Sequence, residues 1–355
     1  MAKVLIVDDS ALMRKHLRSI FESAGFDTEI ARNGEECLEK IPHVKPDAIT
    51  LDINMPVMDG ITCLSLIMAK HPTPVVMVSS LTEKGALATF EALELGAVDY
   101  VPKPSGTVSL NLSESAEVLL DKVRSAIKTR IGKRSGLRSK IRVKREQTEV
   151  QIDKLSQHKF TLNTGQKDVV LIGVSTGGPG CLQTILQDIP ASFTAPIVVS
   201  QHMPAKFTQV FAERLNKRCQ LNVQEVSAPT ALKPGNVYIA QGDADVKIMK
   251  RNNTLMASSI SADNTLLWHP SVDKLVQSAL TVVNPKKLLC VQLTGMGNDG
   301  AESMFAAYKR GATTIAESEE TAVVYGMPRD LVLRGGATIE LPNTQIANAI
   351  MNAVG

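Results

Sequence analysis

The chain has 355 residues, of which 44% are hydrophobic and 21% are charged, and its formal net charge is +3. This composition is ordinary for soluble globular protein, and the length is sufficient for two domains. No apolar run approaches the ~20 residues that a membrane-spanning helix needs, and the chain does not start with the basic and apolar regions of a secretory leader. We therefore expect no membrane insertion and a cytoplasmic location. The five scattered cysteines form no C-x-x-C pair, which disfavours a zinc site or a disulfide framework.

Residues 1–127 alternate between short apolar runs and helical patterns. The expected strands are Val4–Val7, Thr28–Ala31, Ile49–Leu51, Val75–Val78 and Val98–Val101. The expected helices are Ala11–Ser23, Gly34–Ile41, Gly60–Lys70, Lys84–Leu95 and Ala116–Lys128. This alternation predicts a doubly wound, five-stranded parallel sheet. Such sheets bind their ligands beyond the carboxyl ends of the strands.

Polar side chains follow four of these strands. Asp8 and Asp9 follow the first, Asp52 the third, Ser79 the fourth and Lys103 the fifth. Parallel strand ends meet at one edge, where three carboxylates would repel unless a hard cation such as Mg²⁺ lay between them. A carboxylate held there is a possible phosphoryl acceptor, and the lysine ammonium suits a phosphoryl oxygen. Helix capping would explain any single aspartate, but not the whole set.

With these residues in these places, residues 1–127 resemble a response-regulator receiver domain, which has a flavodoxin-like fold. The resemblance implies that Asp52 is the phosphoacceptor and that a histidine kinase is the phosphodonor. It implies a Mg²⁺ site formed by Asp8, Asp9, Asp52 and the backbone carbonyl of Asn54. It also implies that Ser79 and Lys103 are the switch residues.

The apolar pattern dissolves over residues 128–167, which we interpret as a basic linker. Residues 128–145 hold nine Lys and Arg residues and no Asp or Glu. A run of like charge is most simply a solvated linker, and contact with nucleic acid or an acidic partner is the alternative. The run has no interleaved aromatic residues and no apparent recognition helix, so we expect no nucleic-acid binding.

From residue 168 to residue 355 the alternation returns and predicts a second α/β domain. Strand patterns lie at 169–173, 196–200, 287–293 and 313–316, helical patterns lie at 179–188, 206–217, 271–282 and 300–310, and a β-rich stretch lies near 222–257. The two domains share a class but no motif, so they are not repeats.

Ser175 lies in the turn Gly173–Gly177, which follows an apolar strand and satisfies G-x-S-x-G. Such a turn either exposes a nucleophile, binds a phosphate or merely packs. A nucleophilic serine needs a base and an acid that orients the base. His202 and Asp299 each follow a separate apolar strand, so we expect all three side chains at one sheet edge.

The other histidine after Ser175 is His269, which follows no clear strand. The order Ser–Asp–His of common α/β-hydrolases would pair it with an aspartate, for which the candidates are Asp243, Asp245 and Asp263. None of these aspartates follows so clear a strand as Asp299 does. The order Ser175, His202, Asp299 is therefore preferred.

The segments Ile172–Pro179, Gln201–Thr208 and Leu293–Gly300 resemble those of the CheB family of chemotaxis protein-glutamate methylesterases, whose catalytic domain is α/β/α and Rossmann-like. The resemblance implies Ser175 as nucleophile, His202 as general base and acid, and Asp299 as the orienting acid. It also implies the Met296 backbone N–H as an oxyanion donor.

Function follows from the same resemblance. It implies a carboxylic-ester hydrolase that demethylates glutamate γ-methyl esters of chemoreceptors, deamidates glutamines as a second activity, and needs no cofactor for hydrolysis.

From the fusion of two domains we expect the unphosphorylated receiver to restrain the esterase by covering its active-site edge. A DNA-binding regulator using residues 128–145 and a catalytically idle adaptor are the alternatives. The first lacks a helix-turn-helix pattern, and the intact set of Ser175, His202 and Asp299 disfavours the second.

Overall fold

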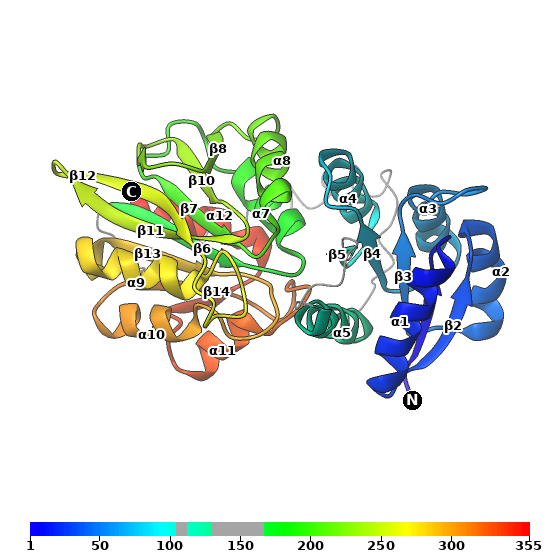
Figure 1. Cartoon of the computed structure of the whole chain (residues 1–355). Helices are drawn as coiled ribbons and strands as arrows, with labels where there is room; N and C mark the ends of the chain where they lie inside the picture. Colours follow the sequence, from blue (N-terminus) through cyan, green and yellow to red (C-terminus); the bar gives the residue numbers. More distant parts are fainter. Residues whose placement is uncertain (104–111, 130–166) are drawn as a thin grey trace, which may run out of the picture.

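A computed structural model describes residues 1–103, 112–129 and 167–355. Two α/β domains lie next to each other, with the N-terminus and the C-terminus in different domains (Figure 1). Most of the expected linker, residues 128–167, lies outside the described residues. No helix in the described ranges is long and apolar enough to cross a membrane.

The N-terminal domain has the predicted five-stranded parallel sheet, in the order β2-β1-β3-β4-β5. Its elements are β1 (Lys3–Val7), α1 (Ala11–Ser23), β2 (Asp27–Ala31), α2 (Gly34–Val44), β3 (Ala48–Asp52), α3 (Gly60–Lys70), β4 (Val75–Ser79), α4 (Glu83–Leu95), β5 (Asp99–Pro102) and α5 (Leu112–Lys128). Successive residues of a strand point to opposite faces. Val4 and Ile6 therefore pack in one cluster with residues of α1 and α5, and Leu5 and Val7 in the other with residues of α2, α3 and α4.

Side chains just before the helices explain where several of them begin. Ser10, Asn33, Asp59 and Thr82 occupy the N-cap positions of α1, α2, α3 and α4, and each accepts a hydrogen bond from a backbone N–H of the first turn. This satisfies a donor that has no partner within the helix.

The C-terminal domain contains a seven-stranded parallel sheet in the order β15-β14-β13-β6-β7-β10-β8, and a separate antiparallel sheet in the order β11-β12-β9. Its elements are β6 (Val169–Val174), α7 (Gly178–Gln187), β7 (Ile197–Gln201), α8 (Ala205–Asn216), β8 (Asn222–Val226), β9 (Thr230–Ala231), β10 (Asn236–Ala240), β11 (Ala244–Arg251), β12 (Thr254–Ser261), α9 (Val272–Val282), η1 (Pro285–Lys287), β13 (Leu288–Gln292), α10 (Ala301–Lys309), β14 (Thr313–Glu317), α11 (Met327–Leu333), β15 (Ile339–Leu341) and α12 (Asn343–Val354). The β-rich stretch thus divides, with β8 and β10 joining the main sheet.

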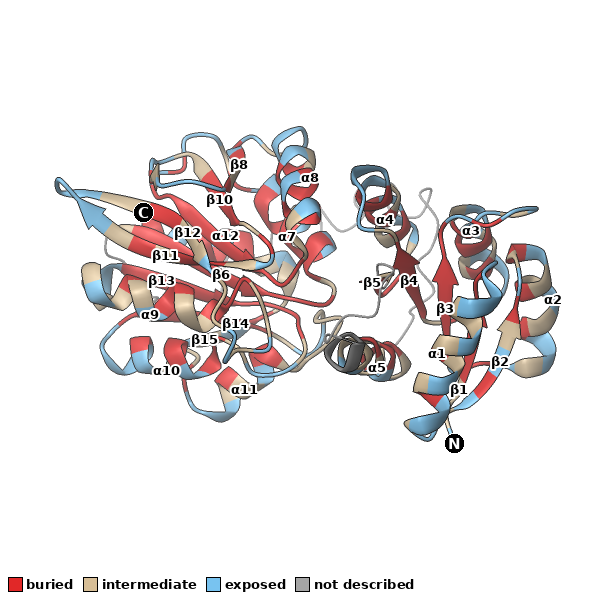
Figure 2. Ribbon diagram, viewed as in Figure 1, coloured by how far each residue is buried: buried red, intermediate tan, exposed pale blue. Residues whose placement is uncertain are grey.

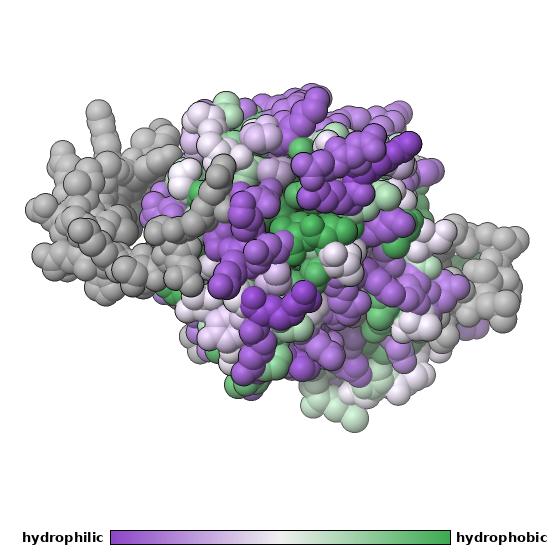
Figure 3. All heavy atoms as spheres, turned by 90° about the vertical axis from the view of Figure 1, so that its left-hand side faces the viewer, coloured by the Kyte–Doolittle hydropathy of each residue, from purple (hydrophilic) through white to green (hydrophobic). Residues whose placement is uncertain are grey.

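Helices cover both faces of the large sheet, which gives the expected α/β/α layers. Val170 and Ile172 of β6 pack in a cluster with residues of α7, α8 and α12, whereas Val169 and Leu171 pack with residues of α9, α10 and α11. Buried residues accordingly concentrate in the parallel sheets of the two domains and on the helix faces turned toward these sheets (Figure 2). Seen from the end opposite the receiver, the surface is mainly hydrophilic, with a small apolar area near its centre (Figure 3).

An aromatic cluster joins the two domains. Phe90 of α4 stacks on Phe211 of α8 with ring centroids 5.4 Å apart, and Tyr100 of β5 stacks on Phe207 at 4.8 Å. Glu94 of α4 also forms ion pairs across the interface, with Arg214 and Arg218 of the C-terminal domain. The N-terminal domain therefore contacts the C-terminal domain through α4 and β5 in this cluster.

Candidate active site and phosphorylation site

The three residues Ser175, His202 and Asp299 follow the carboxyl ends of β6, β7 and β13, as the sequence predicts. Strands β6 and β7 are hydrogen-bonded neighbours, and His202 N–H donates to the carbonyl of Val174 at 3.1 Å. The backbone of the histidine therefore lies beside that of the serine. Both side chains are shielded, since Ser175 is 8% and His202 9% exposed.

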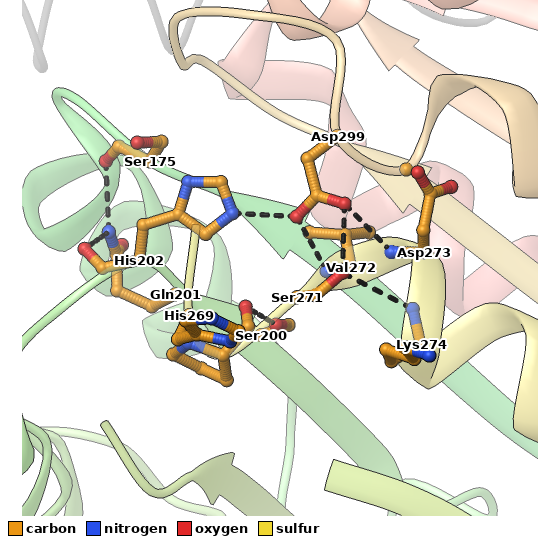
Figure 4. A network of polar contacts seen from close by, with 12 residues as sticks. Ser175, Ser200, Gln201, His202, His269, Ser271, Val272, Asp273, Lys274 and Asp299 are labelled. Atoms are coloured by element: carbon orange, nitrogen blue, oxygen red, sulfur yellow. Dashed lines mark hydrogen bonds and ion pairs between the residues drawn. The ribbon is translucent and has the colours of Figure 1, made fainter. Parts of the chain in front are cut away.

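The His202 ring lies between Ser175 and Asp299 (Figure 4). Its Nε2 atom is 2.8 Å from Asp299 Oδ2. Its Nδ1 atom is buried and has no hydrogen-bond partner in the described part of the chain. One ring nitrogen is thus held by a carboxylate, and the other is available to exchange a proton.

The N-terminus of α9 holds the Asp299 carboxylate. It accepts hydrogen bonds from the N–H groups of Val272 at 2.7 Å and Asp273 at 3.0 Å, and from the Ser271 hydroxyl at 3.0 Å. Burial by itself raises the pKa of a carboxyl group, but the hydrogen bonds from His202 and the backbone outweigh it and hold the pKa of Asp299 below its ordinary value. The group is therefore an anion suited to orienting an imidazole.

Two further features lie near His202, of which the first was not predicted and the second was considered only for the less favoured order of the triad. The indole of Trp268 stacks on the His202 ring with centroids 5.6 Å apart and planes 8° from parallel, so it covers one face of the imidazole. His269 also pairs with an aspartate, since its Nδ1 lies 2.9 Å from Asp245 Oδ1. Asp245 in turn accepts from the N–H of Ser271, so this second pair supports the segment that leads into α9.

The loop after β13 packs directly on the serine turn. Ser175 N–H donates to the Thr294 carbonyl at 2.9 Å, and the Thr294 hydroxyl donates to the Thr176 carbonyl at 2.8 Å. A Cβ atom on Gly295 would lie 2.7 Å from Ser175 Cβ, so only glycine permits this approach. Met296, the expected oxyanion donor, is the next residue and is partly exposed.

Two further residues at this edge were not predicted, namely Gln201 and Gln292, the buried last residues of β7 and β13. The Gln201 amide donates to the carbonyls of Ser175 and His202, and the Gln292 amide to that of Asp299. Their place at a strand end beside a site residue was a usable signal, because polar side chains at parallel strand ends meet at one edge.

In the receiver, the carboxylates of Asp8, Asp9 and Asp52 lie together, each with an oxygen within 4.8 Å of the others. Lys103 Nζ lies 2.7 Å from Asp52 Oδ2 and 3.2 Å from Asp8 Oδ2. Burial is the main cause that raises the pKa of Asp52, and Asp8 adds to it, while the hydrogen bond from Lys103 opposes it. Clustered oxygens of this kind are the ligands that Mg²⁺ prefers, so the residues present fit that ion.

The two other expected receiver residues are also at this edge. The Asn54 N–H donates to Asp52 Oδ1 at 3.3 Å, and Asn54 is exposed. Ser79 is buried, and its hydroxyl donates to the Gly85 carbonyl of α4 at 3.2 Å. The Ser79 side chain therefore bonds to α4, and no hydrogen bond joins it to Asp52 within the residues described.

The receiver contacts both loops of the catalytic edge. The Thr176 hydroxyl donates to Asp99 Oδ2 of β5 at 2.5 Å, and both residues are buried. On the other loop, the Ser125 hydroxyl of α5 donates to the sulfur of Met296 at 3.2 Å. These partners flank Ser175, so the receiver lies against the edge that carries the candidate active site.

The comparisons with known proteins divide the chain as the structure does. Residues 170–350 match the family model described as CheB methylesterase. The chain belongs to this family. Residues 4–112 match the response regulator receiver domain.

Relatives extend over the whole length. A protein-glutamate methylesterase/protein-glutamine glutaminase of Rhodospirillum rubrum is 52% identical, covering 99% of this chain and 95% of the relative. One of Vibrio cholerae is 42% identical over 94% of this chain and 91% of the relative. The crystal structure of the Thermotoga maritima CheB methylesterase catalytic domain is 38% identical with a TM-score of 0.51, covering 53% of this chain and 98% of that one. The chain thus combines a receiver with a CheB-type methylesterase domain.

Proposed function

We propose that this chain removes methyl groups from glutamate γ-methyl esters of chemoreceptors, and that phosphorylation of its receiver controls the rate. The observation that carries the proposal is the contact of His202 with Asp299 beside Ser175, in a chain of the CheB methylesterase family. The printed names of the relatives add glutamine deamidation, which we propose as a second activity of the same site.

In the first half of the reaction, the Ser175 hydroxyl attacks the ester carbonyl carbon while His202 takes the hydroxyl proton at Nδ1. Asp299 holds Nε2–H and stabilises the imidazolium that forms. The oxyanion accepts a hydrogen bond from the Met296 N–H, a donor type that stabilises such intermediates. The carbon–oxygen bond to the methoxy group then breaks, and His202 returns the proton, so methanol leaves.

In the second half, water attacks the acyl–serine ester. His202 takes a proton from this water and gives it to Ser175 Oγ as the acyl–oxygen bond breaks. The products are free serine and the glutamate carboxylic acid, which ionises in water. An amide substrate would follow the same steps and release ammonia. Neither reaction draws on a cofactor in this proposal.

For control, we propose that Asp52 accepts a phosphoryl group from a histidine kinase. Asp8, Asp9, Asp52 and the Asn54 carbonyl would hold Mg²⁺, which neutralises phosphoryl oxygens when bound. Lys103 and Ser79 would bond the phosphoryl oxygens, and the Ser79 hydroxyl would have to leave the Gly85 carbonyl to do so. Breaking this hydrogen bond at the start of α4 would connect phosphorylation of Asp52 to the domain interface, because α4 lies at that interface.

We further propose that the unphosphorylated receiver restrains the esterase. The contacts of Asp99 with Thr176 and of Ser125 with Met296 support this, because they lie against the two loops next to Ser175. The proposed setting is the cytoplasm, where the chain would meet the signalling part of the receptors and the kinase. Nucleic acid has no part in this proposal.

The test is methanol release from methylated receptor membranes, with and without a small phosphodonor. The phosphodonor should raise the rate of the full chain, and Ser175→Ala should abolish it while the exposed Ser261→Ala of β12 should not. A serine-reactive fluorophosphonate should label the wild type but not Ser175→Ala. Full activity of Ser175→Ala would overturn the mechanism, and unlabelled, inactive wild type would favour an adaptor.

A further inference from the structure

Two buried glutamine side chains donate hydrogen bonds to the backbone carbonyls of all three proposed triad residues. Gln201 Nε2 lies 3.0 Å from the Ser175 carbonyl oxygen and 3.2 Å from that of His202. Gln292 Nε2 lies 2.9 Å from the Asp299 carbonyl oxygen. Figure 4 shows the Gln201 amide beside the Ser175 backbone. The three carbonyls belong to three separate loops, and the two amides fix them to strands β7 and β13.

Only the amide nitrogen of each glutamine is hydrogen-bonded within the described residues. Gln201 is 2% exposed and Gln292 is 0% exposed. The Oε1 atom of each is buried and has no hydrogen-bond partner in the described ranges. A buried acceptor without a partner costs free energy. Each glutamine is therefore kept despite this cost at its oxygen, and its Nε2 bonds the carbonyls of the loops that carry the proposed triad.

Glycines next to the amides strengthen this reasoning. A Cβ atom on Gly178, the first residue of α7, would lie 2.0 Å from Gln201 Oε1. A Cβ atom on Gly173 or on Gly300 would lie 2.4 Å from Val272 Cγ1, and 3.0 Å or 2.9 Å from Gln292 Oε1. Gly178 thus leaves room for the Gln201 amide, whereas Gly173 and Gly300 make room first for Val272 and then for the Gln292 amide.

We propose that Gln201 and Gln292 are positioning residues, which fix the positions of the proposed triad residues relative to one another by binding their backbone carbonyls. The inference rests on the proposed roles of Ser175, His202 and Asp299. Misplacement of reacting groups by about 1 Å is enough to lower a rate about 100-fold. Loss of either amide should therefore lower kcat more than it changes substrate affinity.

The test uses Gln201→Met and Gln292→Met in the full chain, with phosphodonor present. Methionine is close in size but donates no hydrogen bond. We expect kcat to fall about 10- to 100-fold with KM within about twofold, because no substrate contact is lost, and Tm to fall only by as much as the loss of one buried hydrogen-bond donor lowers it. Fluorophosphonate labelling of Ser175 should slow in parallel.

The matched control is Tyr238→Phe, which removes a buried donor to the Ala231 carbonyl. Tyr238 lies in β10, where it pairs with Val198 of β7, and its hydroxyl bonds none of the triad residues. This variant should lower Tm and leave kcat unchanged. Methionine variants that keep wild-type kcat would overturn the proposal, as would a kcat loss matched by the tyrosine variant. Activity of Ser175→Ala would instead overturn the triad itself, so the two failures are distinguishable.

A second variant, Gln201→Glu, keeps the proposal testable if the methionine variants do not fold. A buried carboxyl donates only in its neutral form, and burial raises its pKa. The ratio of its kcat to that of the wild type should therefore rise as the pH falls. A ratio that does not change with pH would count against positioning by the amide hydrogens.

Discussion

Thr176, the residue after Ser175, donates its hydroxyl hydrogen to Asp99 of the receiver at 2.5 Å. The other carboxylate oxygen of Asp99 accepts from Lys122 Nζ at 2.9 Å and from the Tyr100 N–H at 2.7 Å. The carboxylate therefore links α5 and β5 to the turn that carries the proposed nucleophile. A movement of β5 or α5 in the receiver acts directly on that turn.

Thr176→Val should raise the esterase rate of the unphosphorylated chain. Valine keeps the shape of threonine but leaves the buried Asp99 oxygen without its donor in the docked state. A hydrogen bond to a charged group contributes about 1.5–3 kcal/mol, so the undocked population should grow at least about tenfold. Methanol release without phosphodonor measures it, and the rate with phosphodonor should stay near that of the wild type.

The matched control for this change is Thr28→Val. Thr28 also donates to a carboxylate, that of Glu22 at 2.8 Å, but within the receiver. It should leave the basal rate as it is. An equal basal rate in the wild type and Thr176→Val would show that docking at this bond does not restrain the enzyme.

Glu94→Gln should loosen the same interface from its outer side. Burial raises the pKa of Glu94, but Arg214 and Arg218 outweigh it and hold that pKa below its ordinary value. The ion pairs are partly exposed, and such pairs contribute about 0.2–1 kcal/mol. Because two pairs are lost, the basal rate should rise by roughly twofold to at most roughly thirtyfold, and added salt should reduce the difference from the wild type.

Glu36→Gln provides the comparison for Glu94→Gln, because Glu36 pairs with Lys40 on α2 of the receiver. It removes an ion pair without touching the interface. If both variants raise the basal rate equally, the effect comes from the stability of the receiver and not from docking.

Much of the site could be predicted because it depends on strand ends. Ser175, His202 and Asp299 were placed correctly at one edge, since parallel strands of one sheet end on the same side. The acidic cluster of the receiver was predicted by the same reasoning. Both follow from local apolar patterns and need no knowledge of how distant segments pack.

The contacts that hold these residues depend on packing between distant segments, and the sequence did not reveal them. The Asp299 carboxylate binds the N-terminus of α9, and Trp268 stacks on His202. Both contacts join loops that are far apart in the chain. The direction of the Ser79 hydroxyl depends on the first turn of α4. Helix α2 was expected to end at Ile41, but it continues past Pro42 to Val44, since the proline still permits the C-terminal turn.

Val57→Asn should stabilise the receiver. Val57 has a φ of 69° and is 73% exposed, so it occupies the left-handed region without making buried contacts. For an L-residue this region costs roughly 1–2 kcal/mol, and asparagine tolerates it better. We expect the midpoint of receiver unfolding to rise by an amount equivalent to about 1 kcal/mol.

Lys45→Asn tests whether that gain comes from the branched side chain. Lys45 has a φ of 49° at the C-cap of α2, where the left-handed conformation is common, and its side chain is not branched at Cβ. Its gain should be smaller than that of Val57→Asn. A Val57→Asn variant less stable than the wild type would show that valine makes contacts that outweigh its conformation.

Asp299→Asn should lower both activity and stability, and the loss of stability should depend on pH. The folded pKa of Asp299 lies below its ordinary value, so ionisation of this group favours the folded state. That contribution is fully present above the unfolded pKa of about 3.9 and is lost as the pH falls through the lower, folded pKa. The asparagine variant lacks it at every pH.

The free energy of unfolding, measured in urea, should therefore differ most between wild type and Asp299→Asn at pH 5–7, by roughly 2 kcal/mol. The difference should begin to shrink near the unfolded pKa of about 3.9 and disappear only below the lower, folded pKa. At neutral pH, kcat should fall about 10³-fold or more, because asparagine no longer stabilises the His202 imidazolium. Asp263→Asn, at the exposed ion pair with Lys274, is the control and should leave kcat unchanged. A difference that stays constant from pH 7 to pH 3 would assign the loss to packing and not to the charge of Asp299.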